Sequence, residues 1–443
     1  MADLATLRET ARRLLDVGIA AGDAGRLTER ALERSGSRLV VGGRTFHLDR
    51  IRRVVMVGAG KAAATMARAA ERVLDGLPIE GLVAVKEAVG PAPRHVRLVE
   101  SGHPLPDARG VAAGEEILRL AGAAGADDLV LCLVSGGGSA LAPAPATGVT
   151  LAEKQAVTRL LLEAGATISE LNAVRKHLSR IKGGQLARAA WPAAVVALLL
   201  SDVIGDPLDV IASGPTVADP TTFADALAVL DRFSLRGRVP GAVRAHLEAG
   251  TRGEIPETPK AGDPALARVT TVVIGNNGLV VEAVAAEARR LGLVPCLLTR
   301  SLQGEAREVA RAFAAILEEA ARSGAPVGRP GCLIAAGETT VTVRGRGRGG
   351  RCQEFAVGAL PSLAGLERAV ILAAGTDGSD GPTDAAGALV DPTSLDRARA
   401  LGLDPARALG DNDAYPFLAA LGDLVVTGPT GSNLMDVYLG LLG

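Results

Sequence analysis

The stretch VVMVGAGKAAATMARA, residues 54–69, decides the fold class of this chain. Apolar, β-prone residues lead into Gly58 and Gly60, a lysine follows, and an alanine-rich helical pattern begins near residue 62. A buried strand that passes through a glycine turn into a helix is the start of a crossover connection between parallel strands. We therefore expect an α/β protein.

Apolar runs similar to this strand recur along the chain, and most are apolar throughout, as strands buried on both faces should be. They predict strands at residues 54–57, 82–85, 129–134, 194–200, 269–274, 296–299, 332–335, 339–343 and 369–373. Helical patterns lie between them at residues 62–74, 110–121, 151–163, 223–233, 279–291 and 305–322. Residues 235–264 are dense in Gly, Pro and charge and interrupt the alternation, so we place domains at residues 1–260 and 261–443.

Composition narrows the classes of function. The 443 residues carry 48 basic and 49 acidic side chains, so the molecule as a whole has no electrostatic attraction for nucleic acid. The longest apolar run, residues 193–200, is far shorter than the roughly 18 residues that a membrane span needs, and the N-terminus lacks a secretory signal pattern. The 4 cysteines are scattered and form no CxxC pair, which suits a reducing compartment. We expect a cytoplasmic protein that binds neither nucleic acid nor a membrane.

The turn at Gly58, Gly60 and Lys61 is the first candidate site. Glycines let the backbone approach a phosphate, and the exposed N–H groups and the dipole of the following helix favour negative charge. Read as GxGxxA with Glu87 at the end of the next predicted strand, the same residues also resemble a dinucleotide-binding fingerprint. The alternative is a tight turn whose lysine is solvated.

A second glycine loop follows the strand predicted at residues 129–134. Its residues are Ser135, Gly136, Gly137, Gly138 and Ser139. Three consecutive glycines are costly in conformational entropy unless something approaches the backbone closely, and a phosphate-binding nest would explain them. A hydrolase nucleophile elbow would not, because Leu141 stands where the GxSxG motif needs glycine. The alternative is a plain loop.

Two groups of aspartates also follow predicted strands. Asp202 and Asp206 lie just past the strand at residues 194–200, at the edge where open α/β sheets bind ligands. Asp377, Asp380 and Asp384 follow the strand at residues 369–373, without the spacing of an EF-hand. Such carboxylates can hold a hard cation or accept a proton from a hydroxyl. The alternative is that they cap helices and turns.

Two basic segments complete the set of candidates. GETTVTVRGRGRGGRCQEF, residues 337–355, is interpreted as a hairpin-like segment whose glycine loop carries Arg344, Arg346, Arg348 and Arg351. The planar guanidinium suits carboxylate or phosphate oxygens, although we expect most of these arginines in an exposed turn. LNAVRKHLSRIKGGQLARA, residues 171–189, carries the basic residues Arg175, Lys176, His177, Arg180 and Lys182. Such a cluster is typical of a solvated helix face.

These segments occur in the order found in the glycerate 2-kinase family, and the resemblance covers nearly the whole chain. The matching segments are VGAGKAA, SGHPLPD, SGGGSAL, NAVRKHLSRIKGGQLA, LSDVIGDPLDVIASGPTVADP, GETTVTV, GGRCQEF, AAGTDGSDGPTDAAGA and TGPTGSNLMD. The resemblance implies a Rossmann-like, three-layer N-terminal domain and a smaller α/β C-terminal domain called MOFRL, whose last segment can pack back on the N-terminal domain. Older naming labels some members hydroxypyruvate reductases.

The resemblance also implies a reaction, in which the γ-phosphoryl group of ATP passes to the 2-hydroxyl of D-glycerate with the help of Mg²⁺ or another divalent cation. Lys61 and Arg351 would be the central catalytic residues. Phosphoryl-transfer chemistry agrees, because fixed positive groups converging from two domains would neutralise the transferred group. Gly58, Gly60, the 135–139 loop and Glu338 would bind nucleotide or substrate. Asp202, Asp206 and Asp377 would hold the metal or orient the hydroxyl.

The chain departs from the family pattern at two positions. Cys352 stands where the family usually has asparagine, and Ala336 where it usually has glycine. Cys352 lacks the donor and acceptor of an amide, so ligand affinity or metal preference would differ if this position contacts ligand. The rival activity is an NAD(P)H-dependent hydroxypyruvate reductase, favoured by the fingerprint that ends at Glu87. A homodimer stays open as well.

Overall fold

The computed structural model describes residues 3–88 and 90–443, and these fall into two compact units. The first, called here the N-terminal unit, spans Ala24–Ile274. The second, called the C-terminal unit, combines Gly275–Gly443 with the start of the chain up to Asp23. The division falls after Ile274 rather than near residue 260, because β9 (Val269–Gly275) completes the sheet of the N-terminal unit.

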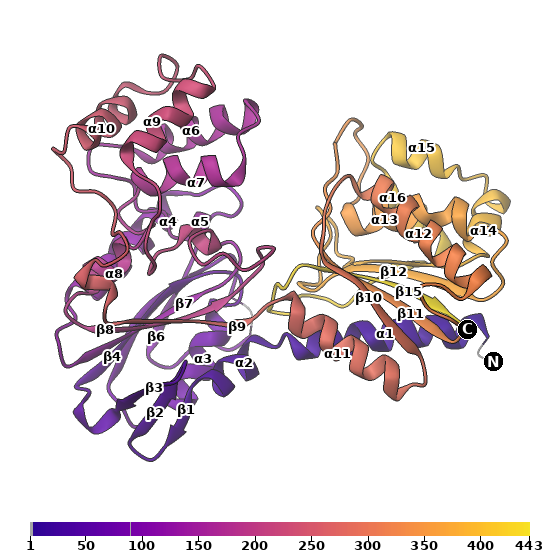
Figure 1. Ribbon diagram of the computed structural model, residues 1–443, viewed down its shortest axis with the longest axis horizontal. Coiled ribbons are helices and arrows are strands. Elements are labelled where there is room, and N and C mark those ends of the chain that lie inside the picture. The colour runs from indigo at the N-terminus through magenta and orange to yellow at the C-terminus, as the bar shows by residue number, and fades with distance from the viewer. Residues whose placement is uncertain (1–2, 89) are drawn as a thin grey trace. The chain divides into compact units, whose positions relative to one another are not determined.

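The N-terminal unit is built on a six-stranded sheet with strand order β6-β5-β4-β7-β8-β9 (Figure 1). Besides β9, its strands are β4 (Arg53–Ala59), β5 (Ile79–Val85), β6 (Val96–Glu100), β7 (Asp128–Val134) and β8 (Ala194–Leu200). The pairings from β6 through β8 are all parallel. Every residue of β7 and β8 is buried, as strands covered on both faces require. The predicted α/β class is confirmed.

Helices cover both faces of this sheet. α4 (Ala108–Gly122) and α8 (Gln185–Ala190) pack against the face that carries Val57. α2 (Ala24–Ala31) and α3 (Ala63–Val73) lie on the opposite face (Figure 1). This is the predicted three-layer arrangement, and it leaves the carboxyl ends of the strands open for a site.

Four further helices of this unit form a cluster of their own around buried residues such as Leu161 (Figure 1). They are α6 (Leu151–Glu163), α7 (Ile168–His177), α9 (Phe223–Arg232) and α10 (Gly241–Thr251). The helices predicted at residues 151–163 and 223–233 are thereby confirmed. The unit also holds a small antiparallel sheet of β1 (Glu33–Ser35), β2 (Arg38–Val41) and β3 (Arg44–His47).

The C-terminal unit is built on a mixed sheet with strand order β10-β11-β15-β12-β13-β14. Its strands are β10 (Val294–Leu302), β11 (Gly331–Gly337), β12 (Ala369–Gly375), β13 (Gly387–Val390), β14 (Leu424–Val425) and β15 (Asp436–Leu442). β10 and β11 are parallel, and the other pairings are antiparallel. Fully buried β15 pairs with β11 and β12, so the last segment of the chain forms the centre of this sheet.

Helices cover both faces of the second sheet as well (Figure 1). α1 (Leu4–Ala21) and α11 (Asn277–Arg290) pack side by side on one face, and α12 (Ala306–Ser323) and α13 (Arg351–Leu363) pack on the other. Three shorter helices complete the unit: α14 (Ser394–Ala400), α15 (Pro405–Gly410) and α16 (Ala414–Leu421). The first helix of the chain thus joins the unit formed by its last residues.

The strand predicted at residues 339–343 is wrong, and the hairpin-like reading falls with it. Thr340 makes one isolated bridge and no ladder. The backbone N–H groups of Arg344 and Gly345 donate instead to the side-chain oxygen of Asn412, at 2.7 and 2.9 Å. The side-chain oxygen of Asn412 thus accepts hydrogen bonds that the backbone carbonyls of a neighbouring strand would otherwise accept. The segment runs as a loop into α13.

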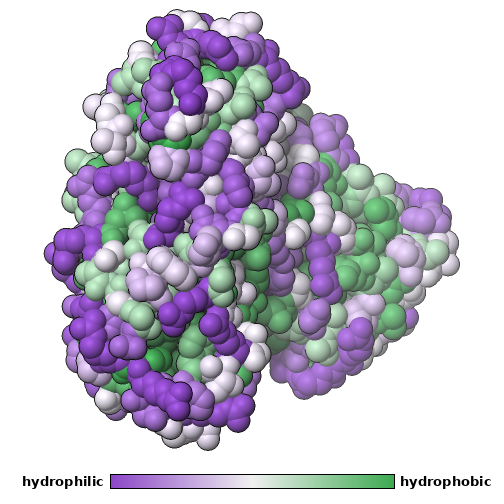
Figure 2. Space-filling model, turned by 60° about the vertical axis from the view of Figure 1, so that its left-hand side comes forward, coloured by the Kyte–Doolittle hydropathy of each residue, from purple (hydrophilic) through white to green (hydrophobic). Residues whose placement is uncertain are grey.

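In the described part of the chain, every helix is too short or too polar to cross a membrane. Figure 2 shows one face of the molecule, on which hydrophilic and hydrophobic residues are interspersed. This mixture agrees with a sequence in which 22% of the residues are charged.

Candidate active site

The loops that follow β4 and β7 lie against each other at the carboxyl edge of the sheet. The backbone N–H of Lys61 donates to the carbonyl of Gly136 (2.9 Å), and the N–H of Ala62 donates to the hydroxyl of Ser135 (2.9 Å). The two glycine motifs therefore form one site, as the adjacency of β4 and β7 requires. In a dinucleotide fingerprint, the N–H groups of this turn would bind the pyrophosphate. Here the N–H groups of Lys61 and Ala62 donate to the second glycine loop instead.

The close approach of these loops explains two glycines without any ligand. A Cβ on Gly60, whose φ is 149°, would lie 2.1 Å from the hydroxyl oxygen of Ser135. A Cβ on Gly137, whose φ is 85°, would lie 2.9 Å from the ring of His103. Gly58 is buried within β4. Direct contact of these glycines with a nucleotide stays a prediction.

A cleft of about 710 Å³ opens beside this pair of loops. Its walls come from the turn at residues 103–106, from residues 137–143, from α6, and from residues at and after the end of α7. His103 and Ser139 line the side toward the glycine loops, and several basic side chains line the cleft as well, among them Lys154, Arg175 and Lys182. The cleft thus joins the predicted phosphate loop to a cluster of positive charge.

These three cations have no carboxylate within ion-pair distance among residues 3–88 and 90–443. Lys154 is 7% exposed, and its ammonium donates to the carbonyl of Leu178 (3.0 Å). Lys182 is 2% exposed and donates to the backbone carbonyl of Ser139 (3.1 Å) and to the hydroxyl of the same residue. Neutral oxygens therefore satisfy hydrogen bonds of both ammonium groups but compensate neither charge.

The electrostatic strain of this arrangement appears in the pKa values. Burial, together with the charge of Arg175, lowers the pKa of Lys154 to about 7. Burial and the charges of Lys154 and Arg175 lower the pKa of Lys182 well below its ordinary value. Burial also lowers the pKa of Arg175. The three cations repel one another across the cleft, so a bound anion would relieve all three.

A chain of hydrogen bonds holds Ser139 in place. Its hydroxyl lies 3.2 Å from the hydroxyl of Ser213, which donates to the side-chain oxygen of Asn172 (3.1 Å). Asn172 belongs to α7, and Ser213 belongs to the long loop after β8. Three motifs distant in sequence are thereby tied together at one wall of the cleft.

The predicted aspartates Asp202 and Asp206 lie in this loop after β8, next to the loop after β7. Asp206 adopts a φ of 53°, and its N–H donates to the carbonyl of Val203 (3.1 Å). Farther along the loop, Asp209 pairs with the ammonium of Lys176 (3.0 Å). The loop is therefore held at the carboxyl edge of the sheet by a buried lysine.

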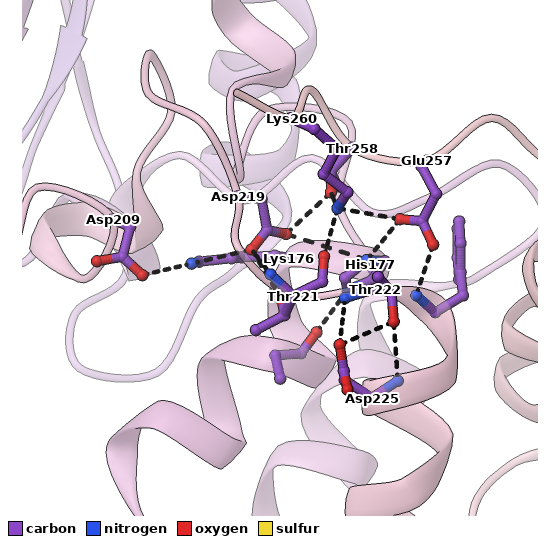
Figure 3. A network of polar contacts seen from close by, with 12 residues as sticks. Lys176, His177, Asp209, Asp219, Thr221, Thr222, Asp225, Glu257, Thr258 and Lys260 are labelled. Carbon is purple, nitrogen blue, oxygen red and sulfur yellow. Dashed lines mark hydrogen bonds and ion pairs between the residues drawn. The ribbon is translucent and has the colours of Figure 1, made fainter. Parts of the chain in front are cut away.

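Lys176 belongs to a network of polar contacts shown in Figure 3. Its ammonium also lies 3.2 Å from Asp219, which in turn accepts hydrogen bonds from the backbone N–H (3.0 Å) and hydroxyl (2.7 Å) of Thr221. The neighbouring His177 contacts Glu257 (3.1 Å). Although burial acts to raise it, the pKa of Asp219 is lowered by the hydrogen bonds of Thr221 and the charge of Lys176.

The expectation that the basic cluster at residues 175–182 forms a solvated helix face is therefore wrong for most of its members. Lys176, His177 and Lys182 are buried, and only Arg180 is exposed. Arg175 and Lys182 line the cleft, whereas Lys176 and His177 belong to the ion network. A run of charged residues usually lies on a solvent-exposed helix face, but other elements cover α7 on several sides and bury these side chains.

Arg351, in the C-terminal unit, opens α13 beside the start of β15. Its guanidinium makes two hydrogen bonds to Asp436, at 2.6 and 2.9 Å, and lies 2.8 Å from Glu338. Burial works against the charge of Arg351, but the hydrogen bonds and charge of Asp436 raise its pKa. Glu338 and Arg351 therefore contact each other, and the carboxylates of Asp436 and Glu338 both compensate the arginine.

The remaining aspartates of this unit support the backbone. Asp380 is buried and accepts hydrogen bonds from the N–H groups of Cys352 (3.1 Å) and Gln353 (2.8 Å), so it caps α13. Burial raises the pKa of Asp380 to about 7. Asp377 accepts a hydrogen bond from the N–H of Ser379 (3.0 Å). The capping alternative therefore describes what Asp380 does in this structure.

The two departures from the family pattern lie in the core of the C-terminal unit. Ala336 is fully buried in β11, and Cys352 is fully buried at the start of α13. Burial and the nearby carboxylates of Asp436 and Asp380 raise the pKa of the Cys352 thiol. The cysteine side chain thus packs against the partner of Arg351 and does not reach the protein surface.

The predicted metal ligands are divided between the two units. Asp202 and Asp206 belong to the N-terminal unit, and Asp377 belongs to the C-terminal unit. Among the described residues, no group of three or more His, Cys, Asp or Glu side chains could hold a metal ion by itself. A cation at this site would have to complete its coordination with substrate phosphates and water, as Mg²⁺ usually does in phosphoryl-transfer enzymes.

Sequence reasoning did not single out Lys154 or Asp436, and it assigned Arg175 and Lys182 to a solvated helix face rather than to a site. Lysine is rare in this arginine-rich chain, and this is only a weak signal for Lys154 and Lys182. Asp436 ends the segment TGPTGSNLMD, so its place in that motif was a signal for it. Nothing local to Arg175 indicates that it faces a cleft while Lys176 does not.

Comparison with known protein families places two matches along the chain. The family described as a domain of unknown function (DUF4147) matches residues 10–248, and the MOFRL family matches residues 331–436. Together they cover most of both units. The order of the two matches is the order implied by the sequence motifs.

Relatives and solved structures match over nearly the whole chain. A protein from Pyrococcus horikoshii named glycerate 2-kinase is 40% identical over 437 residues, which cover 98% of this chain and 97% of the relative. A provisionally named hydroxypyruvate reductase from Agrobacterium vitis is 45% identical over 393 residues, covering 88% of this chain and 87% of the relative. The crystal structure of a glycerate kinase from Thermotoga maritima, 39% identical, matches with a TM-score of 0.87 over 99% of this chain and 100% of that chain.

Proposed function

The chain belongs to the glycerate kinase family and is a phosphotransferase, and from this premise we propose that it transfers the γ-phosphoryl group of ATP to the 2-hydroxyl of D-glycerate. The bond between the γ-phosphorus and the bridging oxygen of ADP breaks, and a bond to the 2-oxygen of glycerate forms. The hydroxyl proton leaves to a carboxylate or to solvent. The products are 2-phospho-D-glycerate and ADP.

The observation that carries this proposal is the way the two glycine loops of the N-terminal unit close on each other. Because the N–H groups of Lys61 and Ala62 bond to Gly136 and Ser135, the turn has no open cradle for the pyrophosphate of a dinucleotide. The loops open instead onto a cleft lined by three basic side chains. This arrangement favours a polyphosphate ligand over a nicotinamide cofactor.

Lys61 and Arg351 are proposed as the catalytic residues. Phosphoryl transfer needs positioned positive charge on the oxygens of the moving group, and a lysine held at the sheet edge can supply it. Arg351 is held rigid by Asp436 and Glu338, which fixes the direction of its remaining N–H groups. That the two residues converge on one phosphoryl group stays a prediction.

The 135–139 loop and Glu338 are proposed as ligand-binding elements. Ser139 lines the cleft, and its hydroxyl is oriented by Lys182 and Ser213, so it is ready to contact a phosphate or carboxylate. Glu338 would act on the nucleotide or substrate through Arg351, with which it forms an ion pair.

A divalent cation fits the donor set of this chain in part. Asp202, Asp206 and Asp377 offer carboxylate oxygens, which are the ligands that Mg²⁺ prefers. Of these, Asp202 and Asp206 lie at the sheet edge beside the phosphate loop, so we propose them as the residues that hold Mg²⁺ or orient the 2-hydroxyl. When bound, the cation would neutralise charge on the ATP phosphates.

The compartment and the oligomeric state are further proposals. The cysteines at positions 132, 296, 332 and 352 are free thiols, and the absence of disulfides among them supports a reducing compartment such as the cytoplasm. A homodimer stays a prediction that size-exclusion chromatography with light scattering would test.

The experiment that tests the function is phosphorus NMR of the product formed from ATP and D-glycerate. A new phosphomonoester resonance coupled to the C2 proton supports the proposal, and coupling to the C3 protons would place the phosphate on the other hydroxyl. The same preparation is offered NADH and hydroxypyruvate without ATP. Oxidation of NADH at a rate above that of kinase turnover would establish the reductase instead.

A further inference from the structure

Lys154, Arg175 and Lys182 of the cleft have no carboxylate partner within ion-pair distance in the described part of the chain. Buried charges are normally paired, because removing an ion from water is costly unless an opposite charge compensates it. Lys154 and Lys182 are nine-tenths or more buried, and Arg175 lies beside them, yet both ammonium groups donate to neutral oxygens. Lys176, the next residue after Arg175, shows the usual solution, with two aspartates at 3.0 and 3.2 Å.

The mouth of the same cleft is apolar and exposed. Leu105 is 76% exposed and Leu162 is 57% exposed, and both line the cleft. Pro104 and Pro106 flank Leu105, and the turn is fixed by a hydrogen bond from the side chain of Gln155 to the carbonyl of Pro106 (2.7 Å). An apolar side chain held in water at the edge of a cleft is a ready contact for a flat aromatic ligand.

We propose that this cleft binds the nucleotide, with its phosphate chain against Lys154, Arg175 and Lys182 and its base against Leu105 and Leu162. The cleft lining combines basic and apolar side chains, and ATP joins a polyanion to an aromatic base. A volume of about 710 Å³ also greatly exceeds what a three-carbon acid would fill. The inference rests on the proposed function, because it takes ATP to be the phosphoryl donor.

This placement brings the phosphate chain toward Lys61. The cleft is bounded by Gly137 and Ser139, whose loop bonds to the backbone of Lys61 through Gly136. Burial, followed by the charge of Lys61, lowers the pKa of His103 in the cleft wall, so the lysine ammonium lies near that ring. The terminal phosphate would therefore reach the loop where the proposed catalytic lysine stands.

The first test is calorimetric titration of the full chain with ATP and, separately, with tripolyphosphate. Arg175→Met is expected to raise the dissociation constant of either ligand about tenfold or more, since a charge-assisted contact to phosphate is lost. Arg180→Met is the matched control. Arg180 lies in the same segment but is exposed and paired with Glu115, so neither affinity changes.

The second test separates the base end from the phosphate end. Leu105→Ser is expected to weaken ATP roughly fivefold while leaving tripolyphosphate unchanged, because only the base contacts this leucine. The side chain is 76% exposed, so the substitution does not threaten folding. Leu401→Ser, at a 57% exposed leucine of the C-terminal unit, serves as its control and changes nothing.

The outcomes distinguish this inference from the proposed function. If Arg175→Met raises the KM for glycerate and leaves the ATP affinity intact, the cleft binds the carboxylate of the acid and the nucleotide assignment is overturned. If Arg175→Met and Leu105→Ser alter neither ligand, the cleft is not a site of this reaction at all. Both results can be read from binding and KM values even if product analysis assigns a different acceptor hydroxyl.

Discussion

The cleft of the N-terminal unit and the Arg351 cluster of the C-terminal unit handle positive charge in opposite ways. Lys154, Arg175 and Lys182 are gathered with no carboxylate among the described residues to compensate them. Arg351 is bound by the carboxylates of Asp436 and Glu338. The cations of the first group repel one another when no anion is bound, whereas the charge of Arg351 is compensated without a ligand.

This difference assigns separate tasks to the two regions. A group of cations without carboxylate partners can bind an anion strongly, because no existing ion pair has to be broken before the anion binds. A compensated arginine is held in a fixed direction instead, and its contribution depends on orientation. Binding strength should therefore depend mostly on the cleft, and catalytic geometry on the arginine.

The largest expected effect comes from Arg351→Ala. We expect kcat to fall about a hundredfold or more, as for removal of one preorganised charge. We also expect the free energy of unfolding to fall by about 3 kcal/mol, because the carboxylate of Asp436 is left buried without its partner. Steady-state kinetics and urea unfolding measure the two quantities.

A double variant separates these two roles of Arg351. Asp436→Asn added to Arg351→Ala should recover much of the stability and none of the activity, because the unpaired charge is gone but the guanidinium is still absent. If the double variant is active, Arg351 serves only to neutralise Asp436, and its proposed catalytic role is contradicted.

Lys61→Ala tests the N-terminal region in the same way. Turnover should again fall about a hundredfold or more. Unlike Arg351→Ala, this change should keep the unfolding free energy within about 1 kcal/mol, because Lys61 is half-buried on a turn rather than in a core. Near-normal turnover in the purified variant would remove Lys61 from the mechanism.

Two adjacent residues sharpen the comparison within one helix. Lys176→Met should lower the unfolding free energy by about 3 kcal/mol, since it strands the buried carboxylate of Asp219. Arg175→Met should leave stability unchanged or raise it slightly, because it removes a charge that has no carboxylate partner. Equal losses in the two variants, measured by thermal and urea unfolding, would show that the cleft cations are compensated after all.

The smallest expected effect is a proton taken up with the nucleotide. The pKa of Lys154 is lowered to about 7, so this ammonium is mostly neutral at pH 8, and a bound phosphate restores its charge. Calorimetry in two buffers of different ionisation enthalpy should show an uptake approaching one proton at pH 8 and little at pH 6. Lys154→Met should lower the uptake at pH 8 by nearly one proton.

The sign of the effect on stability follows from the same shift. The unfolded chain binds a proton at Lys154 below a pKa of 10.5, whereas the folded chain does so only near 7, so stability without ligand falls as pH drops through this interval. Besides Arg175 and Lys182, the ionisable groups of the cleft are His103, whose pKa is lowered, and Arg159 and Glu163 of α6.

Much of the fold could be predicted because its signals are local. The spacing of apolar residues and the length of each apolar run predict the buried strands and the helix at residues 151–163. The glycines at the ends of predicted strands indicate the two glycine loops. The strand predicted at residues 339–343 failed because its backbone bonds outside any ladder: the carbonyl of Thr342 accepts a hydrogen bond from the side-chain amide of Asn412, 70 residues away. Long-range pairing of this kind leaves no local pattern.

What the sequence by itself determined is the order of strands, loops and helices, and with it the positions of Lys61, the 135–139 loop and Asp202 at strand ends. Only the tertiary structure decided which charges are compensated. Arg175 and Lys176 are neighbours of the same chemical kind, yet Arg175 lines the cleft with no carboxylate within ion-pair distance in the described part of the chain, and Lys176 lies between two aspartates. The physical reason is that the energy of a charge depends on its burial and on partners brought from other elements, which no run of adjacent residues contains.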